Sequence, residues 1–179
     1  MAFQTISLKN LYKSNDKDSI QFLMESLSNF KCKYDSHDLE DFLQNKALEF
    51  EERNLIRTYL VCQDIVDNLH GYFSIGIKSL ILDGVSTKYK RLIASTDRAK
   101  SASVFLIAHI GACKSSNLEK YELLKIAVSY LKHAQDIIGL RAVYLDCDKD
   151  NKKLIKYYES FGFAVISEDE QYKNLIMKL

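Results

Sequence analysis

The most constraining feature of the sequence is an almost uninterrupted apolar run, SVFLIAHIGA, at residues 103–112. Such a run, with no polar alternation, is typical of a central strand whose two faces are both covered. A helical pattern follows over residues 118–138, and a second strand-like segment, RAVYLDC, occupies residues 141–147. A strand, a long helix and a further strand in this order predict an α/β fold with a mixed sheet.

The helix predicted at residues 118–138 carries its own boundary signals. Ser116 and Glu119 have the spacing of a capping box, and Gly139 stands where a helix commonly ends. The first-turn N–H groups of such a helix have no backbone partner, so together with the helix dipole they attract an anion such as a pyrophosphate. Every strand–loop–helix unit offers this signal, and it is weak on its own.

Shorter elements surround this central unit. Asp38 is expected to cap a helix that runs to residue 50, because apolar residues follow it at helical spacing. The residues DIVDNLH, 64–70, are expected to connect two strands as a hairpin. Further strands are predicted at residues 3–8, 57–64, 71–82, 163–166 and 172–177, and further helices at residues 19–30 and 151–160.

The composition favours one soluble globular domain spanning residues 1–179. Lys and Arg number 25 against 24 Asp and Glu, and the net charge of +1 argues against a general nucleic-acid coat. No apolar run reaches the roughly 18 residues of a membrane helix, and the amino terminus does not resemble a secretory signal. The four cysteines form no C-x-x-C pair, which favours reduced thiols in a cytoplasmic protein over a metal site or a disulfide framework.

Residues 83–100 carry five basic residues against two aspartates. Charge runs are usually solvated, so a mobile loop is the favoured interpretation. The alternative is a basic patch that faces the substrate. The basic residues are Lys88, Lys90, Arg91, Arg98 and Lys100.

The sequence DCDKDNKKLIKYYESFGFAVI, residues 146–166, resembles the C-terminal motif of the GNAT (Gcn5-related N-acetyltransferase) acyltransferases. In that family an Asn begins a short helix, a Tyr lies seven residues later, and Glu and Gly-Phe follow. Asn151, Tyr158, Glu159 and Gly162 fit this pattern. The segments DLEDFLQNKALEFEERNLIRTYLVCQD and GYFSIGIKSL are similar to the GNAT branch that includes toxin acetyltransferases.

The resemblance implies a GNAT-like fold, with a mixed, mostly antiparallel central sheet and helices on both faces. It implies direct transfer of an acetyl group from acetyl-CoA to an amine, without a metal. Backbone N–H groups near Ile110 and Ala112 would stabilise the oxyanion, and Tyr158 would protonate the departing thiolate. The alternative for Tyr158 is core packing. Asn151 is expected to cap the last helix or to contact the cofactor.

The pyrophosphate loop departs from the family pattern, which places two glycines just before the helix. The cofactor-binding positions of this loop are here Ser115, Ser116, Asn117, Leu118 and Lys120. Glycines let the backbone approach phosphates closely, so Leu118 and Lys120 would crowd that approach unless the loop is displaced. The charges of Lys114 and Lys120 would offset part of this loss.

His109 is the candidate base for the amine, because imidazole titrates near neutrality. A hydrogen-bonded core histidine is the alternative, and it is favoured for a lone histidine on an apolar strand. The acceptor stays open between a small-molecule or protein amine and the α-amine of an aminoacyl-tRNA, whose phosphates would meet residues 83–100. A non-catalytic binding protein on the same scaffold is the alternative from another class. A homodimer and an antitoxin partner are left open as well.

Overall fold

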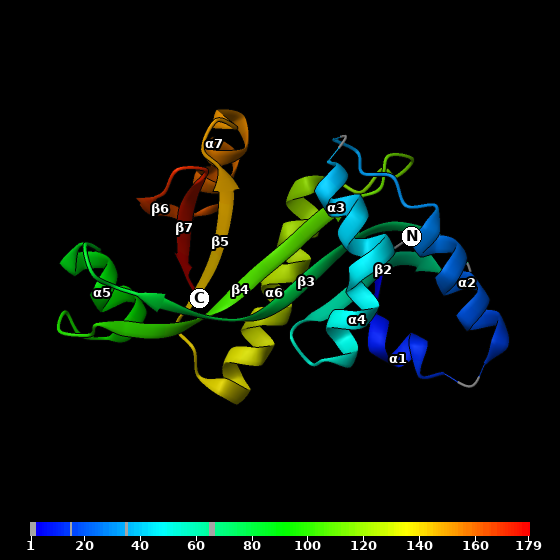
Figure 1. Ribbon diagram of the computed structural model, residues 1–179, viewed down its shortest axis with the longest axis horizontal. Coiled ribbons are helices and arrows are strands. Elements are labelled where there is room, and N and C mark those ends of the chain that lie inside the picture. Colours follow the sequence, from blue (N-terminus) through cyan, green and yellow to red (C-terminus); the bar gives the residue numbers. More distant parts are fainter. Residues whose placement is uncertain (1–2, 15, 35, 65–66) are drawn as a thin grey trace. The chain divides into compact units, whose positions relative to one another are not determined.

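The computed structural model describes residues 3–14, 16–34, 36–64 and 67–179 (Figure 1). Its strands are β1 (Gln4–Ser7), β2 (Arg57–Asp64), β3 (Asp67–Ile81), β4 (Ser101–Ala112), β5 (Ala142–Asp148), β6 (Ala164–Glu168) and β7 (Tyr172–Lys178). They form one sheet in the order β1-β2-β3-β4-β5-β7-β6. β4 and β5 are parallel, whereas the pairs β1–β2, β2–β3, β5–β7 and β6–β7 are antiparallel. The predicted mixed, mostly antiparallel sheet is therefore confirmed.

Most of the helices lie between β1 and β2, and the others connect β3 to β4, β4 to β5 and β5 to β6. They are α1 (Leu8–Tyr12), α2 (Lys17–Ser28), α3 (His37–Asp41), the π-helix η1 (Phe42–Lys46), α4 (Ala47–Glu52), α5 (Thr87–Ala94), α6 (Lys120–Ile138) and α7 (Lys152–Phe161). In the part of the chain that the structure describes, no helix is both long enough and apolar enough to span a membrane.

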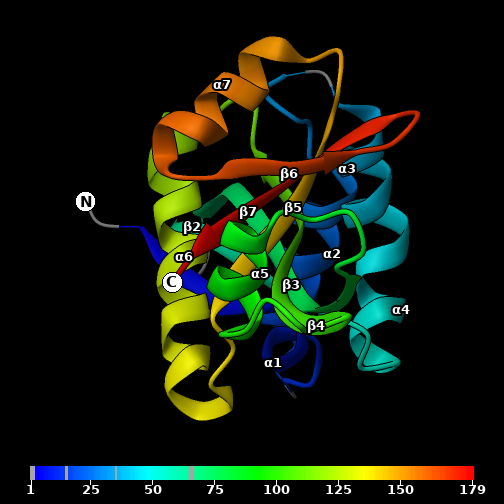
Figure 2. The ribbon, with the colours of Figure 1, turned by 90° about the vertical axis from the view of Figure 1, so that its left-hand side faces the viewer.

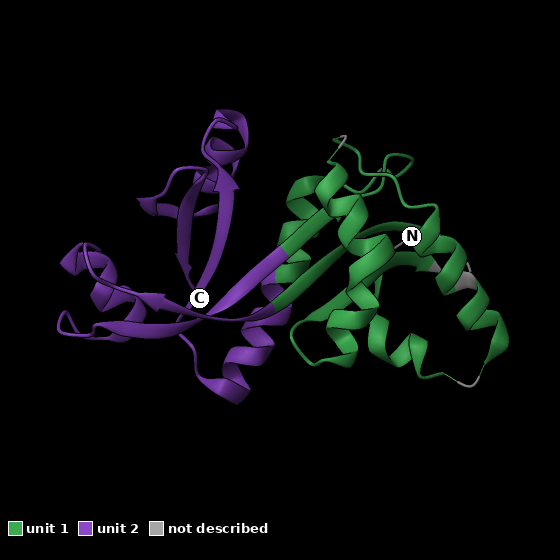
Figure 3. Cartoon of the chain, viewed as in Figure 1, with its two compact units in different colours: residues 1–75, 109–127 green, residues 76–108, 128–179 purple. Residues whose placement is uncertain are grey.

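The contacts divide the chain into two compact units (Figure 3). Unit 1 comprises residues 1–75 and 109–127, and unit 2 comprises residues 76–108 and 128–179. The interpretation of residues 1–179 as a single domain stays a prediction. Each unit has its own buried residues, and each is described by itself below.

In unit 1, helices α3 and α4 lie on one face of the strands and the first turns of α6 lie on the other (Figure 2). Tyr72 of β3 is fully buried, and its hydroxyl donates to the carbonyl oxygen of Leu39 in α3 at 2.7 Å. On the opposite face, a Cβ atom at Gly71 would lie 2.9 Å from the carbonyl oxygen of Gly111 in β4. Real Cβ atoms do not approach a backbone oxygen so closely, so this position requires glycine.

The helical segment after residue 36 begins earlier than predicted and is not regular. Ser36 stands at the N-cap position, and the expected cap, Asp38, lies instead in the first turn of α3. There its negative carboxylate interacts favourably with the positive end of the helix dipole. The five-residue π-helix η1 then interrupts the α-helical pattern before α4. The apolar residues of this segment are three and four positions apart, a spacing that an uninterrupted α-helix also shows, so the sequence pattern does not mark this turn.

The predicted hairpin between β2 and β3 is present, and the strands extend further than expected. β2 ends at Asp64 and β3 begins at Asp67, so part of the connection expected at residues 64–70 belongs to the strands. Residues 65 and 66 lie outside the described residues. A bulge between Val61 and Cys62 shifts the register of this pair.

The prediction of a mobile loop at residues 83–100 is wrong, because the centre of this segment forms α5 in unit 2. Ile93 of α5 is buried in a cluster with Leu82 and Val104, and Arg141 Nε donates to the carbonyl oxygen of Leu92 at 3.2 Å. The apolar side chains of α5 therefore anchor one side of a helix whose other side is charged. Charged residues surround the apolar residues of α5, so the sequence did not show their helical spacing.

Candidate functional site

The amino-terminal half of β4 lies in unit 2, where the strand meets its parallel neighbour. Phe105 is in register with Val143 of β5, and Leu106 is in register with Tyr144. β4 continues to Ala112 without further register pairs to β5 among the described residues. The resemblance to the GNAT family implies that acyl-CoA lies beside β4 where this strand separates from β5.

The carboxy-terminal end of β4 lies in unit 1, and its side chains alternate regularly between the two faces of the sheet. The ring of His109 stacks on Phe42, with centroids 3.5 Å apart, and a Cβ at Gly111 would contact Leu39 at 3.5 Å. His109 and Gly111 thus face the same helical segment. The backbone groups of the intervening Ile110 therefore point to the same edge of β4 as those of Ala112.

That edge is partly occupied by the connection between α2 and α3. The Lys33 amide donates to the carbonyl oxygen of Ala112 at 2.8 Å, and the Lys114 amide donates to the carbonyl oxygen of Lys31 at 2.7 Å. Between these two bonds, Cys32 and Cys113 form an isolated antiparallel bridge. The carbonyl of Ala112 is therefore already bonded, while the roles predicted for the amides of Ile110 and Ala112 stay proposals.

The predicted capping box at the start of the long helix is wrong. α6 begins at Lys120, not at Leu118, and the carbonyl oxygen of Glu119 accepts from the Leu123 amide at 3.0 Å. Ser116 Oγ instead accepts from the Leu118 amide at 2.9 Å and bonds His70 Nδ1 of β3 at 2.7 Å. Ser116 is buried, so its hydroxyl fixes the loop to the strand and does not cap the helix.

Leu118 does not crowd the loop as the sequence suggested. Its side chain is fully buried and lies over Gly71, where Leu118 Cδ2 would be 3.2 Å from an added Cβ. The Leu118 side chain is therefore directed toward β3, and the glycine that makes room for it lies in that strand. Among the predicted cofactor-binding residues of the loop, Ser115 and Asn117 are exposed and Lys120 is half-buried.

Lysine side chains gather beside this loop. Lys33 Nζ donates to the carbonyl oxygen of Ser116 at 3.2 Å and lies 3.8 Å from Glu119 Oε1. Lys120 Nζ lies 3.4 Å from the centre of the Tyr34 ring, and partial burial lowers the pKa of Lys120. Lys33, Tyr34 and His70 were missed by the sequence reasoning. Their positions in the sequence carry no signal, because only the fold brings them to the loop.

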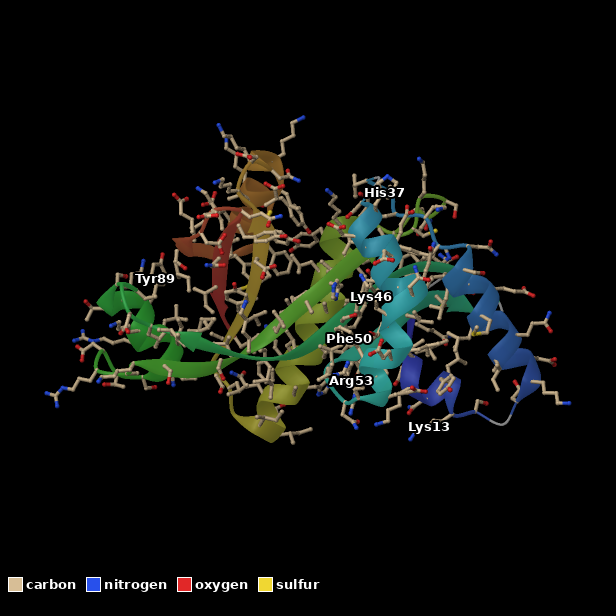
Figure 4. The ribbon with its side chains drawn as sticks, in the orientation of Figure 1. Lys13, His37, Lys46, Phe50, Arg53 and Tyr89 are labelled. Carbon is tan, nitrogen blue, oxygen red and sulfur yellow. The ribbon has the colours of Figure 1, made fainter. Side chains whose placement is uncertain are left out.

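The surroundings of His109 favour the core interpretation over the catalytic one. Burial, and then the charge of Lys46 at the end of η1 (Figure 4), lower the pKa of His109 to about 4. Its Nδ1 atom is buried, and no hydrogen-bond partner lies among the described residues. An imidazole with this pKa is neutral at physiological pH but is a weak base toward an ammonium group.

Tyr158 lies in unit 2 on α7, in an aromatic cluster. Its ring packs against Phe163 at a centroid distance of 5.8 Å, and its side chain is buried. Burial, with smaller contributions from Cys147 and Tyr157, raises the pKa of Tyr158 far above its usual value. The phenol therefore stays protonated at physiological pH. Core packing, the alternative that the sequence left open for Tyr158, is observed. The raised pKa keeps the proton on the phenol, but it makes transfer of that proton to a thiolate more strongly uphill.

The ends of α7 agree with the sequence motif. Asn151 Oδ1 accepts from the Leu154 amide at 3.1 Å, so Asn151 caps the helix as predicted. Gly162 follows the last turn with φ of 114°, a backbone conformation that residues with a side chain rarely adopt. Its amide donates to the carbonyl oxygen of Glu159 at 3.0 Å. Contact between Asn151 and a cofactor stays a proposal.

The cysteines offer no obvious nucleophile. All four are buried and free. Burial raises the pKa of Cys62 and of Cys147 to about 11, which disfavours the reactive thiolate. Within the described ranges, no group of three or more His, Cys, Asp or Glu side chains is arranged to hold a metal ion.

No protein-family model matches the sequence, and no curated protein matches it either. The fold, in contrast, matches solved structures over nearly the whole chain. One is the toxin AtaT complexed with acetyl-methionyl-tRNAfMet, with 17% identity, a TM-score of 0.70, and coverage of 97% of this chain and 94% of that one. Another is a tyrosine-to-phenylalanine mutant of KacT, with 15% identity, a TM-score of 0.71, and coverage of 99% and 95%.

A third match is a mutant AtaT toxin bound to acetyl-CoA and to the C-terminus of the antitoxin AtaR. It has 14% identity, a TM-score of 0.67, and coverage of 99% of this chain and 94% of that one. At these identities the likeness concerns the fold alone. The GNAT-like fold expected from the sequence is confirmed, and the roles of individual residues are argued below from this chain.

Proposed function

We propose that the chain is an N-acyltransferase that moves an acetyl group from acetyl-CoA directly to an amine. The observation that carries this proposal is β4, which runs on to Ala112 after its last register pair with β5 and leads through a short loop into α6. Between Leu106, the last residue paired with β5, and Ala112, whose carbonyl is bonded to Lys33, this edge of β4 can offer hydrogen bonds to an extended amide such as pantetheine. A helix start attracts the pyrophosphate. Acetyl-CoA is present in a solved structure of this fold.

The reaction that we propose needs three contributions. The amine nitrogen attacks the thioester carbonyl, and backbone N–H groups at the end of β4 stabilise the oxyanion. The carbon–sulfur bond then breaks, and Tyr158 donates its phenolic proton to the departing thiolate. The acylated nitrogen releases one proton to solvent, and the phenolate takes one back from solvent, so the step balances. His109 is a poor candidate for the base that deprotonates the amine, because the pKa of its imidazole is low. An α-amine, with a pKa near 8, depends less on such a base than an alkylamine with a pKa near 10.

The test is a Tyr158→Phe variant with Tyr157→Phe as its matched control. Loss of a general acid costs roughly 10²–10⁴ in rate. We expect Tyr158→Phe to lower CoA thiol release about a hundredfold while it keeps the acetyl-CoA dissociation constant. Tyr157→Phe, on the same helix, is expected to keep both.

Two other results would lead to different conclusions. Unchanged turnover in Tyr158→Phe would contradict the role of Tyr158 as the acid but not the transfer reaction. A wild-type chain that binds acetyl-CoA without transferring its acetyl group to any amine, or that binds none of it, would support the non-catalytic alternative. Calorimetric titration measures the binding in either case.

For the acceptor, we infer that the α-amine of an aminoacyl-tRNA is a specific candidate. The solved AtaT complex contains acetyl-methionyl-tRNAfMet. In unit 2, residues 83–100 carry five basic residues against two aspartates. Three of the basic residues lie on α5, where Lys88 Nζ is 5.3 Å from the centre of the Tyr89 ring. Along η1 and α4 of unit 1, Lys46 pairs with Asp41 and Arg53 pairs with Glu49. On α5 itself, Arg91 pairs with Asp97. Lys88 and Lys90 of α5 are therefore our candidates for phosphate contacts.

Transfer of labelled acetyl groups to charged and uncharged tRNA tests this acceptor. Label should enter charged tRNA only, and the rate should fall steeply with salt, because phosphate contacts release counterions. Replacing Lys88 and Lys90 with Met should weaken the salt dependence. Equal labelling of a lysine-containing peptide would contradict the assignment to aminoacyl-tRNA and favour a general amine acceptor.

A further inference from the structure

The glycine-free loop before α6 has a close neighbour that comes from elsewhere in the sequence. Residues 31–34, called here the 31–34 segment, belong to the connection between α2 and α3. This segment lies along the end of β4 through the bridge between Cys32 and Cys113, and two backbone hydrogen bonds flank that bridge. It therefore forms an isolated β-bridge at the edge where β4 runs into the loop.

A buried carboxylate holds the 31–34 segment in place. Glu40 of α3 is 8% exposed, and its Oε1 accepts from the Cys32 amide at 2.8 Å. Its Oε2 lies 3.2 Å from Lys31 Nζ. The hydrogen bond from Cys32, the largest effect, lowers the pKa of Glu40, so the carboxylate is charged at neutral pH. A buried charge with these partners is costly to move, which fixes the segment relative to α3.

The side chains of the segment reach the loop that lacks its glycines. Lys33 Nζ donates to the carbonyl of Ser116, and 25% of the Lys33 side chain is exposed. The ring of Tyr34 lies under Lys120 Nζ and directs that ammonium group. Two positive charges from distant parts of the sequence thus converge beside the loop, with Glu119 as the only carboxylate seen within 4 Å of Lys33 among the described residues.

We propose that the 31–34 segment is a second wall of the acyl-CoA site, in which Lys33 binds the pyrophosphate and Glu40 and Tyr34 are positioning residues. This inference rests on the proposed function. It explains how the loop compensates for its missing glycines: Ser116 Oγ already occupies the Leu118 amide, so charge from Lys33 and Lys120 takes the place of backbone N–H groups. Glu119 is exposed, and its carboxylate can turn to solvent when a phosphate binds to Lys33.

The test compares two probes by calorimetric titration: acetyl-CoA, and S-acetylpantetheine, which has no pyrophosphate. Lys33→Met should weaken acetyl-CoA binding about tenfold, the usual effect of losing a charge-assisted contact, and should leave S-acetylpantetheine binding unchanged. Lys125→Met is the matched control, because it removes an equal charge from an exposed position on α6 that lies outside both the 31–34 segment and the loop. It should change the binding of either probe less than about threefold.

The positioning role of Glu40 has its own readout. Glu40→Gln keeps an oxygen that can accept from the Cys32 amide, so it should keep most of the acetyl-CoA affinity, whereas Glu40→Ala should lose as much as Lys33→Met. If Glu40→Ala does not fold, Tyr34→Leu at an exposed position replaces it, and this variant should weaken acetyl-CoA binding but not S-acetylpantetheine binding.

The outcomes separate this inference from the proposed function. A wild-type chain that binds no acetyl-CoA overturns the proposed function and the inference with it. A wild-type chain that binds acetyl-CoA, with the same affinity in Lys33→Met, overturns the inference alone. Equal weakening of both probes in a folded Lys33→Met variant also overturns it, because the loss would then not lie at the pyrophosphate.

Discussion

The two junctions between a strand and a helix, β4–α6 in unit 1 and β5–α7 in unit 2, are stabilised in different ways. At β5–α7, Asn151 directly precedes the helix and accepts from the amide three residues further on, and Gly162 ends the helix, so both signals are local. At β4–α6, Ser116 bonds His70 and Leu118 packs over Gly71, at sequence separations of more than 40 residues. The first junction can be recognised from a short motif. The second exists only once β3 and the α2–α3 connection are in place.

Among the substitutions that test this comparison, Leu118→Ala should lower the free energy of unfolding the most. Removing a fully buried leucine costs about 2–5 kcal/mol, because a cavity remains. At the other junction, Leu154 is half-buried, so Leu154→Ala should cost clearly less. Urea denaturation of both variants measures the difference. Equal losses would show that the β4–α6 junction does not depend more on distant packing than the β5–α7 junction.

The free energy of unfolding should depend on pH through His109, which lies near the end of β4. The pKa of this histidine is about 4 in the folded chain against an ordinary value of 6.5, so the unfolded chain binds the proton more readily. The free energy of unfolding should therefore fall as the pH drops from 6.5 toward 4, by on the order of 2 kcal/mol. His109→Phe keeps a ring against Phe42 and should remove this dependence. His133→Gln, at an exposed position on α6, should retain it.

Ser116→Ala should cost about 1–3 kcal/mol, because it leaves the buried Leu118 amide without its acceptor. The loss should be partly shared with His70. A double-mutant cycle with His70→Ala is expected to show a coupling energy of at least ~0.5 kcal/mol, as for other residues in direct contact. Additive losses would contradict the bond between these two side chains as the link from the loop to β3.

Asn151→Ala should give the smallest effect, about 1 kcal/mol, which is the usual cost of losing an N-cap. Asn151→Ser should restore most of it, because a serine hydroxyl can accept from the same amide. Such a rescue within one residue would show that the β5–α7 junction is local. If Asn151→Ser is as unstable as Asn151→Ala, the asparagine has a further role, and acetyl-CoA titration of both variants would locate it.

The same division explains what the sequence could predict. The sheet, the long helix and the capped α7 follow from apolar runs, turn residues and a motif, which are all local signals. The start of α6 was predicted wrongly, because Ser116 and Glu119 have capping-box spacing while the fold uses Ser116 for a bond to β3. α5 was missed, because charged residues surround a short apolar face. Lys33 and Glu40 gain their meaning only through tertiary contacts, which no local pattern encodes.

The burial of all four cysteines has a consequence for how this protein can be studied. A thiol reagent modifies a buried cysteine only while its surroundings are transiently open, so the labelling rate reports the free energy of that opening. Cys32 and Cys113 lie at the β4–α6 junction, whereas Cys62 and Cys147 lie in β2 and β5. The unmodified chain thus carries its own reporters of local opening, and ligand protection of one pair over the other can be followed residue by residue without introducing a probe.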